Sequence, residues 1–133
     1  MKQNKELFIK LNIEKSDEAL RGAKLLYDDN APMSSLNRSY YSIFYTVTAL
    51  AEKHRFKTSK HITMMRWFNN KFIYENQIFD KKISAIYKKA FQFRQKSDYD
   101  TFYKPNIEIA GELIADAKLF IETVRKEIFR KDE

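Results

Sequence analysis

The sequence predicts an all-α fold, an up-and-down bundle of four long helices and one shorter helix. Its 133 residues include only two glycines and two prolines, so the residues that separate strands and hairpins are almost absent. Apolar residues recur at steps of three and four along most of the chain, which is the period of a helix with one buried face. With 44% apolar residues the chain can bury one core, and we expect a single domain over residues 1–133.

The first predicted helix extends from about Lys5 to Tyr27 and ends at the polar run Asp28-Asp29-Asn30. Its core-facing candidates are Leu7, Leu11, Leu20, Ala23 and Leu26. Asn30 is also expected to cap a second helix that has Pro32 in its first turn and continues to about Lys53. One side of this central helix is lined by Leu36, Tyr40, Ile43, Phe44, Val47, Leu50 and Ala51.

The third, shorter helix follows a polar and basic stretch. Thr58 or Ser59 is expected to cap it, and we expect it to end near Asn76. Its apolar residues are Ile62, Met65, Phe68, Phe72 and Ile73.

Asp80 is expected to cap a fourth helix that reaches Arg94 and Asp98 in its last turns. Its apolar residues are Ile83, Ile86, Tyr87, Ala90 and Phe91. After a break at Tyr103-Lys104-Pro105 the last helix begins at about Ile107 and has the most regular apolar stripe of the chain. That stripe consists of Ala110, Ile114, Ala117, Ile121, Val124 and Ile128, widened by Leu113 and Phe120.

The composition excludes several classes of site. The absence of cysteine rules out disulfides, a thiol nucleophile and cysteine-based metal centres, and it favours a cytoplasmic protein. No apolar run reaches the roughly 18 residues of a membrane span, so we expect no membrane association. Metal-ligand spacings, Gly-rich phosphate loops and hydrolase motifs are missing too, and we expect neither a metal nor another cofactor.

The net charge of +7 is concentrated in the middle of the chain. Residues 52–96 carry 12 basic and 3 acidic side chains. These form a positive face that suits nucleic acid if the helices that bear them are neighbours. A solvated, lysine-rich surface explains the same pattern without any ligand.

Two distant segments each place an arginine among tyrosines, Arg38 within residues 37–45 and Arg94 within residues 93–100. An arginine carried inward needs a carboxylate partner or a polar cleft. In one explanation Arg94 pairs with Asp98 four residues along its helix, and Arg38 pairs with a carboxylate of another helix. In the other, both arginines converge with Tyr41, Asp98 and Tyr99 on a cleft that holds phosphate.

Three motifs, in this order and spacing, resemble the HEPN domains of bacteria and archaea, in their branch of small stand-alone proteins. Asn37-Arg38-Ser39-Tyr40-Tyr41-Ser42-Ile43-Phe44 is similar to the family's R-x-YY-x-x-F helix. Lys57-Thr58-Ser59-Lys60-His61 resembles its lysine-to-histidine turn, and Phe93-Arg94-Gln95-Lys96-Ser97-Asp98-Tyr99-Asp100 resembles its R-x-x-x-DY segment. The resemblance covers nearly the whole chain.

The resemblance implies a helical bundle that forms a homodimer. Many HEPN relatives are metal-independent RNases, often toxins paired with a minimal nucleotidyltransferase antitoxin or parts of phage defence. Their active motif is an arginine followed, after four to six residues, by a histidine. Counted from Arg94 those positions are Tyr99, Asp100 and Thr101, so the family's histidine is absent.

Metal-free RNA cleavage needs a group that accepts the 2′-hydroxyl proton and one that stabilises the phosphorane. We expect Arg94 to stabilise the phosphorane with help from Asp98, Tyr99 or His61, of which the carboxylate and the phenol are poor bases at neutral pH. A lone histidine after a basic run is also a common helix cap or surface residue. The residues expected to bind RNA or nucleotide are Arg38, Tyr41, Lys60, Arg94 and Lys96.

Two alternatives to a ribonuclease stay open. The chain fits an inactive module that binds nucleotide or RNA, or that docks on a nucleotidyltransferase. It also fits a structural adaptor, for which we expect both arginines to be paired with carboxylates and no polar cleft to exist.

Overall fold

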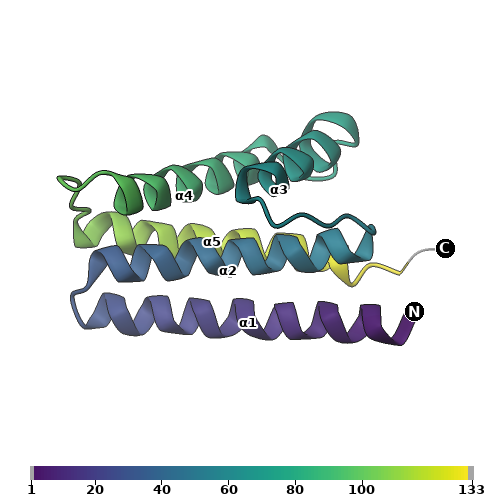
Figure 1. Cartoon of the computed structure of the whole chain (residues 1–133), viewed down its shortest axis with the longest axis horizontal. Coiled ribbons are helices and arrows are strands. Elements are labelled where there is room, and N and C mark those ends of the chain that lie inside the picture. The colour runs from purple at the N-terminus through teal and green to yellow at the C-terminus, as the bar shows by residue number, and fades with distance from the viewer. Residues whose placement is uncertain (1, 132–133) are drawn as a thin grey trace.

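The computed structural model describes residues 2–131, and in this part of the chain every regular element is helical, which confirms the all-α prediction (Figure 1). In chain order the elements are α1 (Lys2–Asp28), α2 (Pro32–Lys53), α3 (His61–Phe68), the π-helical segment η1 (Asn69–Glu75), α4 (Lys81–Tyr99) and α5 (Ile107–Ile128).

Helix α2 is the centre of the bundle. It packs against α1, α3, α4 and α5, whereas α1 lies at one edge of the molecule and α3 and α4 lie together at the opposite edge (Figure 1). The apolar faces predicted for α2, α4 and α5 are buried, apart from a partly exposed Phe44. Aromatic rings fill the space between these helices, and Phe68, Tyr87 and Phe120 contact one another there with no exposed surface. Side chains of α2 can therefore meet side chains of α1, α3, α4 and α5.

The core-facing prediction for α1 was wrong for Leu7 and Leu11, whose side chains are 54% and 46% exposed. The face that α1 buries against α2 is made of small and polar side chains instead. The Ser16 hydroxyl lies 2.8 Å from both the Ser42 carbonyl oxygen and the Thr46 hydroxyl, and all three residues are buried. Small side chains let two helix backbones approach closely, and these hydrogen bonds satisfy the polar atoms that the approach buries.

Asn30 does not cap α2. It adopts a left-handed backbone conformation, with φ 57°, and ends α1. The Ala31 N–H donates to the Leu26 carbonyl at 2.8 Å and the Asn30 N–H donates to the Tyr27 carbonyl at 3.0 Å, which is the hydrogen-bond pattern of a Schellman motif. Helix α2 then begins at Pro32 with Ala31 before it. Asparagine suits both positions, and the tight turn between the helices decided between them.

Neither Thr58 nor Ser59 caps α3, because Lys60 occupies that position and His61 is the first helical residue. The Thr58 hydroxyl accepts a hydrogen bond from the Lys60 N–H instead, at 3.1 Å. The predicted end near Asn76 is confirmed, but the last two turns, η1, are wider than an α-helix. Asp80 caps α4 as predicted, since its carboxylate accepts a hydrogen bond from the Lys82 N–H at 2.9 Å.

None of the helices in residues 2–131 combines the length and apolar character that a membrane span requires.

The end of α2 repeats the Schellman pattern with a less suitable residue. Arg55 is exposed and adopts φ 61°, while the Phe56 N–H donates to the Ala51 carbonyl. A left-handed conformation costs about 1 kcal/mol for a residue with a Cβ atom and nothing for glycine. We expect Arg55→Gly to raise the free energy of unfolding by about 1 kcal/mol in urea titrations.

Asn30→Gly is the matched control at the corresponding position of α1. Asparagine tolerates the left-handed region, so the gain there should be no more than a few tenths of a kcal/mol. Equal effects at the two positions, or no gain from Arg55→Gly, would contradict the proposed strain.

Candidate functional site

Arg94 of α4 and His61 of α3 lie side by side, although 33 residues separate them in the sequence. Arg94 Nη1 is 2.9 Å from His61 Nδ1, and the Tyr40 hydroxyl oxygen of α2 is 2.7 Å from the same nitrogen. Three helices thus contribute side chains to a single cluster. We call Arg94, His61, Tyr40, Tyr41 and Asp98 the arginine–histidine cluster.

The contact with Arg94 sets the tautomer of His61. A guanidinium group only donates hydrogen bonds, so Nδ1 must be an acceptor and the neutral ring carries its proton on Nε2. Burial and the nearby charge of Arg94 both lower the pKa of His61 from its usual 6.5. The positive end of α3, which begins at this residue, acts in the same direction. His61 is therefore neutral at pH 7.

Aromatic rings hold the His61 imidazole and the Arg94 guanidinium in place. The His61 ring stacks on Phe44, with ring centres 4.1 Å apart and planes 8° from parallel. The Arg94 guanidinium carbon lies 5.1 Å from the ring centre of Tyr40 and 5.4 Å from that of Tyr41. Stacking of this kind fixes the plane of a guanidinium group while its edge stays available for hydrogen bonds.

Tyr40 is wholly buried, and this burial raises the pKa of its phenol although the Arg94 charge opposes that effect. The hydroxyl therefore keeps its proton, which it donates to His61. The apolar spacing of α2 predicts Tyr40 on its core-facing stripe and does not indicate that its hydroxyl belongs to the site. Its place in the R-x-YY-x-x-F motif was the only sign in the sequence of such a role.

Asp98 and Tyr99 have different surroundings. Asp98 Oδ2 lies 3.3 Å from Arg94 Nε and forms the predicted intrahelical ion pair. The angle between these groups is unsuitable for a hydrogen bond, so Arg94 Nε has no hydrogen-bond partner within the described residues. The Tyr99 side chain is 82% exposed, and within residues 2–131 it forms no hydrogen bond or ring contact with Arg94 or His61. The structure brings Asp98 to the cluster and leaves Tyr99 on the surface beside it.

Arg38 approaches the cluster from the other side of Tyr41. Its guanidinium carbon is 4.9 Å from the Tyr41 ring centre, and its Nη2 donates to the Asn37 side-chain oxygen at 3.1 Å. Within residues 2–131 no carboxylate pairs with Arg38, so the expected interhelical ion pair is not formed. Both arginines therefore contact one tyrosine ring, and only Arg94 has a carboxylate partner.

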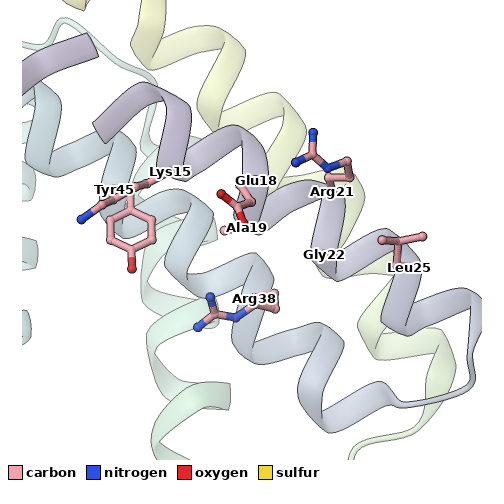
Figure 2. Close-up of a pocket in the computed structure, with 8 residues that line it drawn as sticks. All are labelled: Lys15, Glu18, Ala19, Arg21, Gly22, Leu25, Arg38 and Tyr45. Carbon is pink, nitrogen blue, oxygen red and sulfur yellow. The ribbon is translucent and has the colours of Figure 1, made fainter. Parts of the chain in front are cut away.

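A groove of about 400 Å³ opens beside Arg38, between α1 and α2 (Figure 2). Arg38 and Tyr45 line it from α2, and Lys15, Glu18 and Arg21 line it from α1. For a structural adaptor, both arginines were expected to be paired with carboxylates and no polar cleft was expected. The structure differs, because Arg38 has no carboxylate partner within the described residues and a polar groove lies beside it.

The two predicted lysines lie outside the cluster. Lys60 is exposed and directly precedes His61 at the start of α3. Lys96 is exposed on α4, where its ammonium group is 5.8 Å from the Tyr103 ring centre. Neither forms an ion pair within the described residues, so both add positive charge to the surface around the cluster.

The elements that carry the excess positive charge are neighbours. Segment η1 and α4 pack against each other, and α3 continues directly into η1 (Figure 1).

Among residues 2–131, no group of three or more histidine, aspartate or glutamate side chains is placed to hold a metal ion.

Comparisons with known proteins agree with the motifs. The family model described as HEPN domain matches residues 9–128. Two proteins of Methanocaldococcus jannaschii, both named as candidate toxins, are 31% identical over 86% of this chain and 84% of theirs, and 28% identical over 90% and 81%. A UPF0332 protein of Thermotoga maritima is 30% identical over 92% of each chain.

Proposed function

Because the chain belongs to the HEPN domain family, we propose that it is a toxin-like protein that cleaves RNA without a metal ion, as part of a toxin–antitoxin or defence system. The observation that carries this proposal is the 2.9 Å contact between Arg94 and His61. The family pattern takes its arginine and histidine from one segment, and α4 lacks that histidine. In this fold, α3 supplies a histidine at hydrogen-bonding distance from the same arginine.

In the proposed reaction Arg94 holds a non-bridging oxygen of the scissile phosphate. A guanidinium group has five N–H donors, so Arg94 can turn from Nδ1 of His61 toward an arriving phosphate. Its fixed positive charge then stabilises the negative charge that develops on the phosphorane. The rings of Tyr40 and Tyr41 keep the guanidinium plane in position during this turn.

When both Arg94 and the Tyr40 hydroxyl turn away from Nδ1, the lone pair of His61 becomes available to the 2′-hydroxyl proton. The 2′-oxygen attacks phosphorus, its proton passes to Nδ1, and the bond from phosphorus to the 5′-oxygen breaks. The products are a 2′,3′-cyclic phosphate and a 5′-oxygen that takes a proton from solvent. His61 suits this role because its lowered pKa keeps it unprotonated at neutral pH.

The wild-type chain itself gives the first test. Purified without any partner and assayed in EDTA, it should cut single-stranded RNA and leave 2′,3′-cyclic phosphate ends. Products with 3′-hydroxyl ends, or cleavage that EDTA abolishes, would contradict the proposed chemistry. A chain that leaves several RNAs intact would exclude the ribonuclease.

An inactive binding module is the second candidate, and the occupied lone pair of His61 favours it. In the free chain both Arg94 and Tyr40 point hydrogen bonds at Nδ1, and Asp98 already pairs with Arg94. If these contacts persist with ligand present, the site holds phosphate but accepts no proton. RNA, a nucleotide or a nucleotidyltransferase would then bind with Arg94-dependent affinity and stay unmodified.

A homodimer, a minimal nucleotidyltransferase antitoxin and a cytoplasmic setting complete the proposal. The toxin names of the two Methanocaldococcus jannaschii relatives support a toxin–antitoxin context. Tyr99 and Phe102 support a protein partner near the cluster, because they are 82% and 93% exposed at the end of α4. Sedimentation of the purified chain distinguishes one copy from two.

A further inference from the structure

The groove between α1 and α2 has an unusual charge balance. Lys15, Arg21 and Arg38 line it together with one carboxylate, Glu18. Within the described residues none of these four side chains forms an ion pair, so the three cations are not neutralised by the protein. Its lining therefore carries a net positive charge, which favours an anion.

Arg38 is the group best placed to bind that anion. Its guanidinium face lies against Tyr41, and the hydrogen bond to Asn37 occupies only Nη2. The remaining N–H donors form the planar fork that matches a phosphate group. Tyr45 lies beside Arg38 in the same groove, with its ring 5.7 Å from the ammonium group of Lys15 (Figure 2). A partly exposed tyrosine ring in a groove that binds phosphate suits a nucleotide base.

Tyr41 links Arg38 of the groove to Arg94 of the arginine–histidine cluster, because both guanidinium groups lie near its ring. Arg38 lies 4.9 Å and Arg94 5.4 Å from the centre of that ring, so the two guanidinium carbons are no more than about 10 Å apart. At a rise of about 3.4 Å per nucleotide along one strand, this span corresponds to at most about three nucleotides. One short stretch of a single strand can therefore reach both arginines.

We propose that the α1–α2 groove binds a phosphate of single-stranded RNA, within about three nucleotides of the phosphate held by Arg94. The inference rests on the proposed function for the choice of RNA. It adds Lys15 and Arg21 as further cations that line the groove and Tyr45 as a stacking surface. It also assigns Glu18 an unfavourable effect on binding, because its carboxylate repels the same phosphate.

The test measures binding of a fluorescent single-stranded RNA of about 12 nucleotides by anisotropy, in EDTA and at several salt concentrations. Arg38→Gln should weaken binding about tenfold, and Lys15→Gln should weaken it less. Each should lower the salt dependence of log K by about 0.7. Glu18→Gln should instead tighten binding about twofold, which simple loss of structure does not produce.

Lys24→Gln is the matched control, since Lys24 is an exposed lysine of α1 that does not line the groove. Groove variants that bind RNA like this control, while Arg94→Ala loses affinity, would overturn the groove site and leave the proposed function standing. If the groove variants lose affinity and Arg94→Ala binds RNA like the control, the result would support the groove site and contradict a phosphate site at Arg94. Wild-type protein that binds no RNA would overturn both.

Competition with ATP distinguishes the two possible sources of the bound phosphate, a strand of RNA and a free nucleotide. RNA should stay bound at ATP concentrations far above that of the protein, because a strand of about 12 nucleotides offers more phosphates and bases to the site than one free nucleotide does. Displacement of RNA by micromolar ATP in wild type but not in Arg38→Gln would assign the groove to a free nucleotide and overturn the RNA site.

Discussion

Arg94→Ala is expected to lower the rate of RNA cleavage by about 10²–10³-fold, the usual cost of removing one donor that stabilises a developing negative charge. Arg94 is the only group that touches His61, Tyr40, Tyr41 and Asp98 within the described chain, so its loss removes the centre of the cluster. The measurement is the single-turnover cleavage rate in EDTA.

Arg94→Lys and Lys118→Ala make this result specific. Arg94→Lys keeps the charge but not the planar fork of donors, and its rate should lie between those of wild type and Arg94→Ala. Lys118 is an exposed residue of α5, and its replacement removes a charge away from the cluster. Full activity in folded Arg94→Ala, checked by thermal unfolding, would exclude the proposed role.

His61→Ala is expected to lower cleavage by about 10²–10⁴-fold, because the proposed general base is lost. His61→Asn is the stricter variant, since its amide oxygen still accepts a hydrogen bond from Arg94 but does not take up a proton at neutral pH. Equal loss in both variants indicates proton transfer, whereas an active His61→Asn would indicate that His61 only positions Arg94.

The lowered pKa of His61 also predicts the direction of two pH effects. The base is active only when unprotonated, so cleavage should hold as pH falls to 6.5 and decline below that value, near the folded-state pKa. In the unfolded chain the same ring binds its proton with a pKa near 6.5. Protonation therefore favours unfolding, and the free energy of unfolding should fall as pH decreases below about 6.5.

His61→Asn should flatten this part of the stability profile, because it removes the proton-binding group. The measurement is urea unfolding between pH 7 and pH 5. His54 is the other histidine of the sequence, so His54→Asn is the matched control. A profile that only His54→Asn flattens would contradict the lowered pKa at His61.

Local sequence patterns were sufficient for most elements of the fold. The three-four spacing in the last helix predicted a stripe that is buried in α5, and the capping role predicted for Asp80 is confirmed. The predicted burial of Leu7 and Leu11 was wrong because periodicity shows which face of a helix is apolar but not whether a neighbouring helix covers it. Helix α1 lies at the edge of the bundle and buries small side chains against α2, and this close approach leaves the leucines in solvent.

The sequence by itself determined an all-α chain and most of its helix boundaries, because these depend on residues close together along the chain. The order and spacing of three motifs carried the HEPN resemblance, and the spacing of Arg94 and Asp98 predicted their ion pair as one of two explanations. Only the tertiary structure decided that His61 meets Arg94 and Tyr40, residues 33 and 21 positions away. It also decided that Arg38 lines a groove with Lys15. Such contacts depend on how each helix is rotated against its neighbours, and that rotation is set by the packing of the whole core.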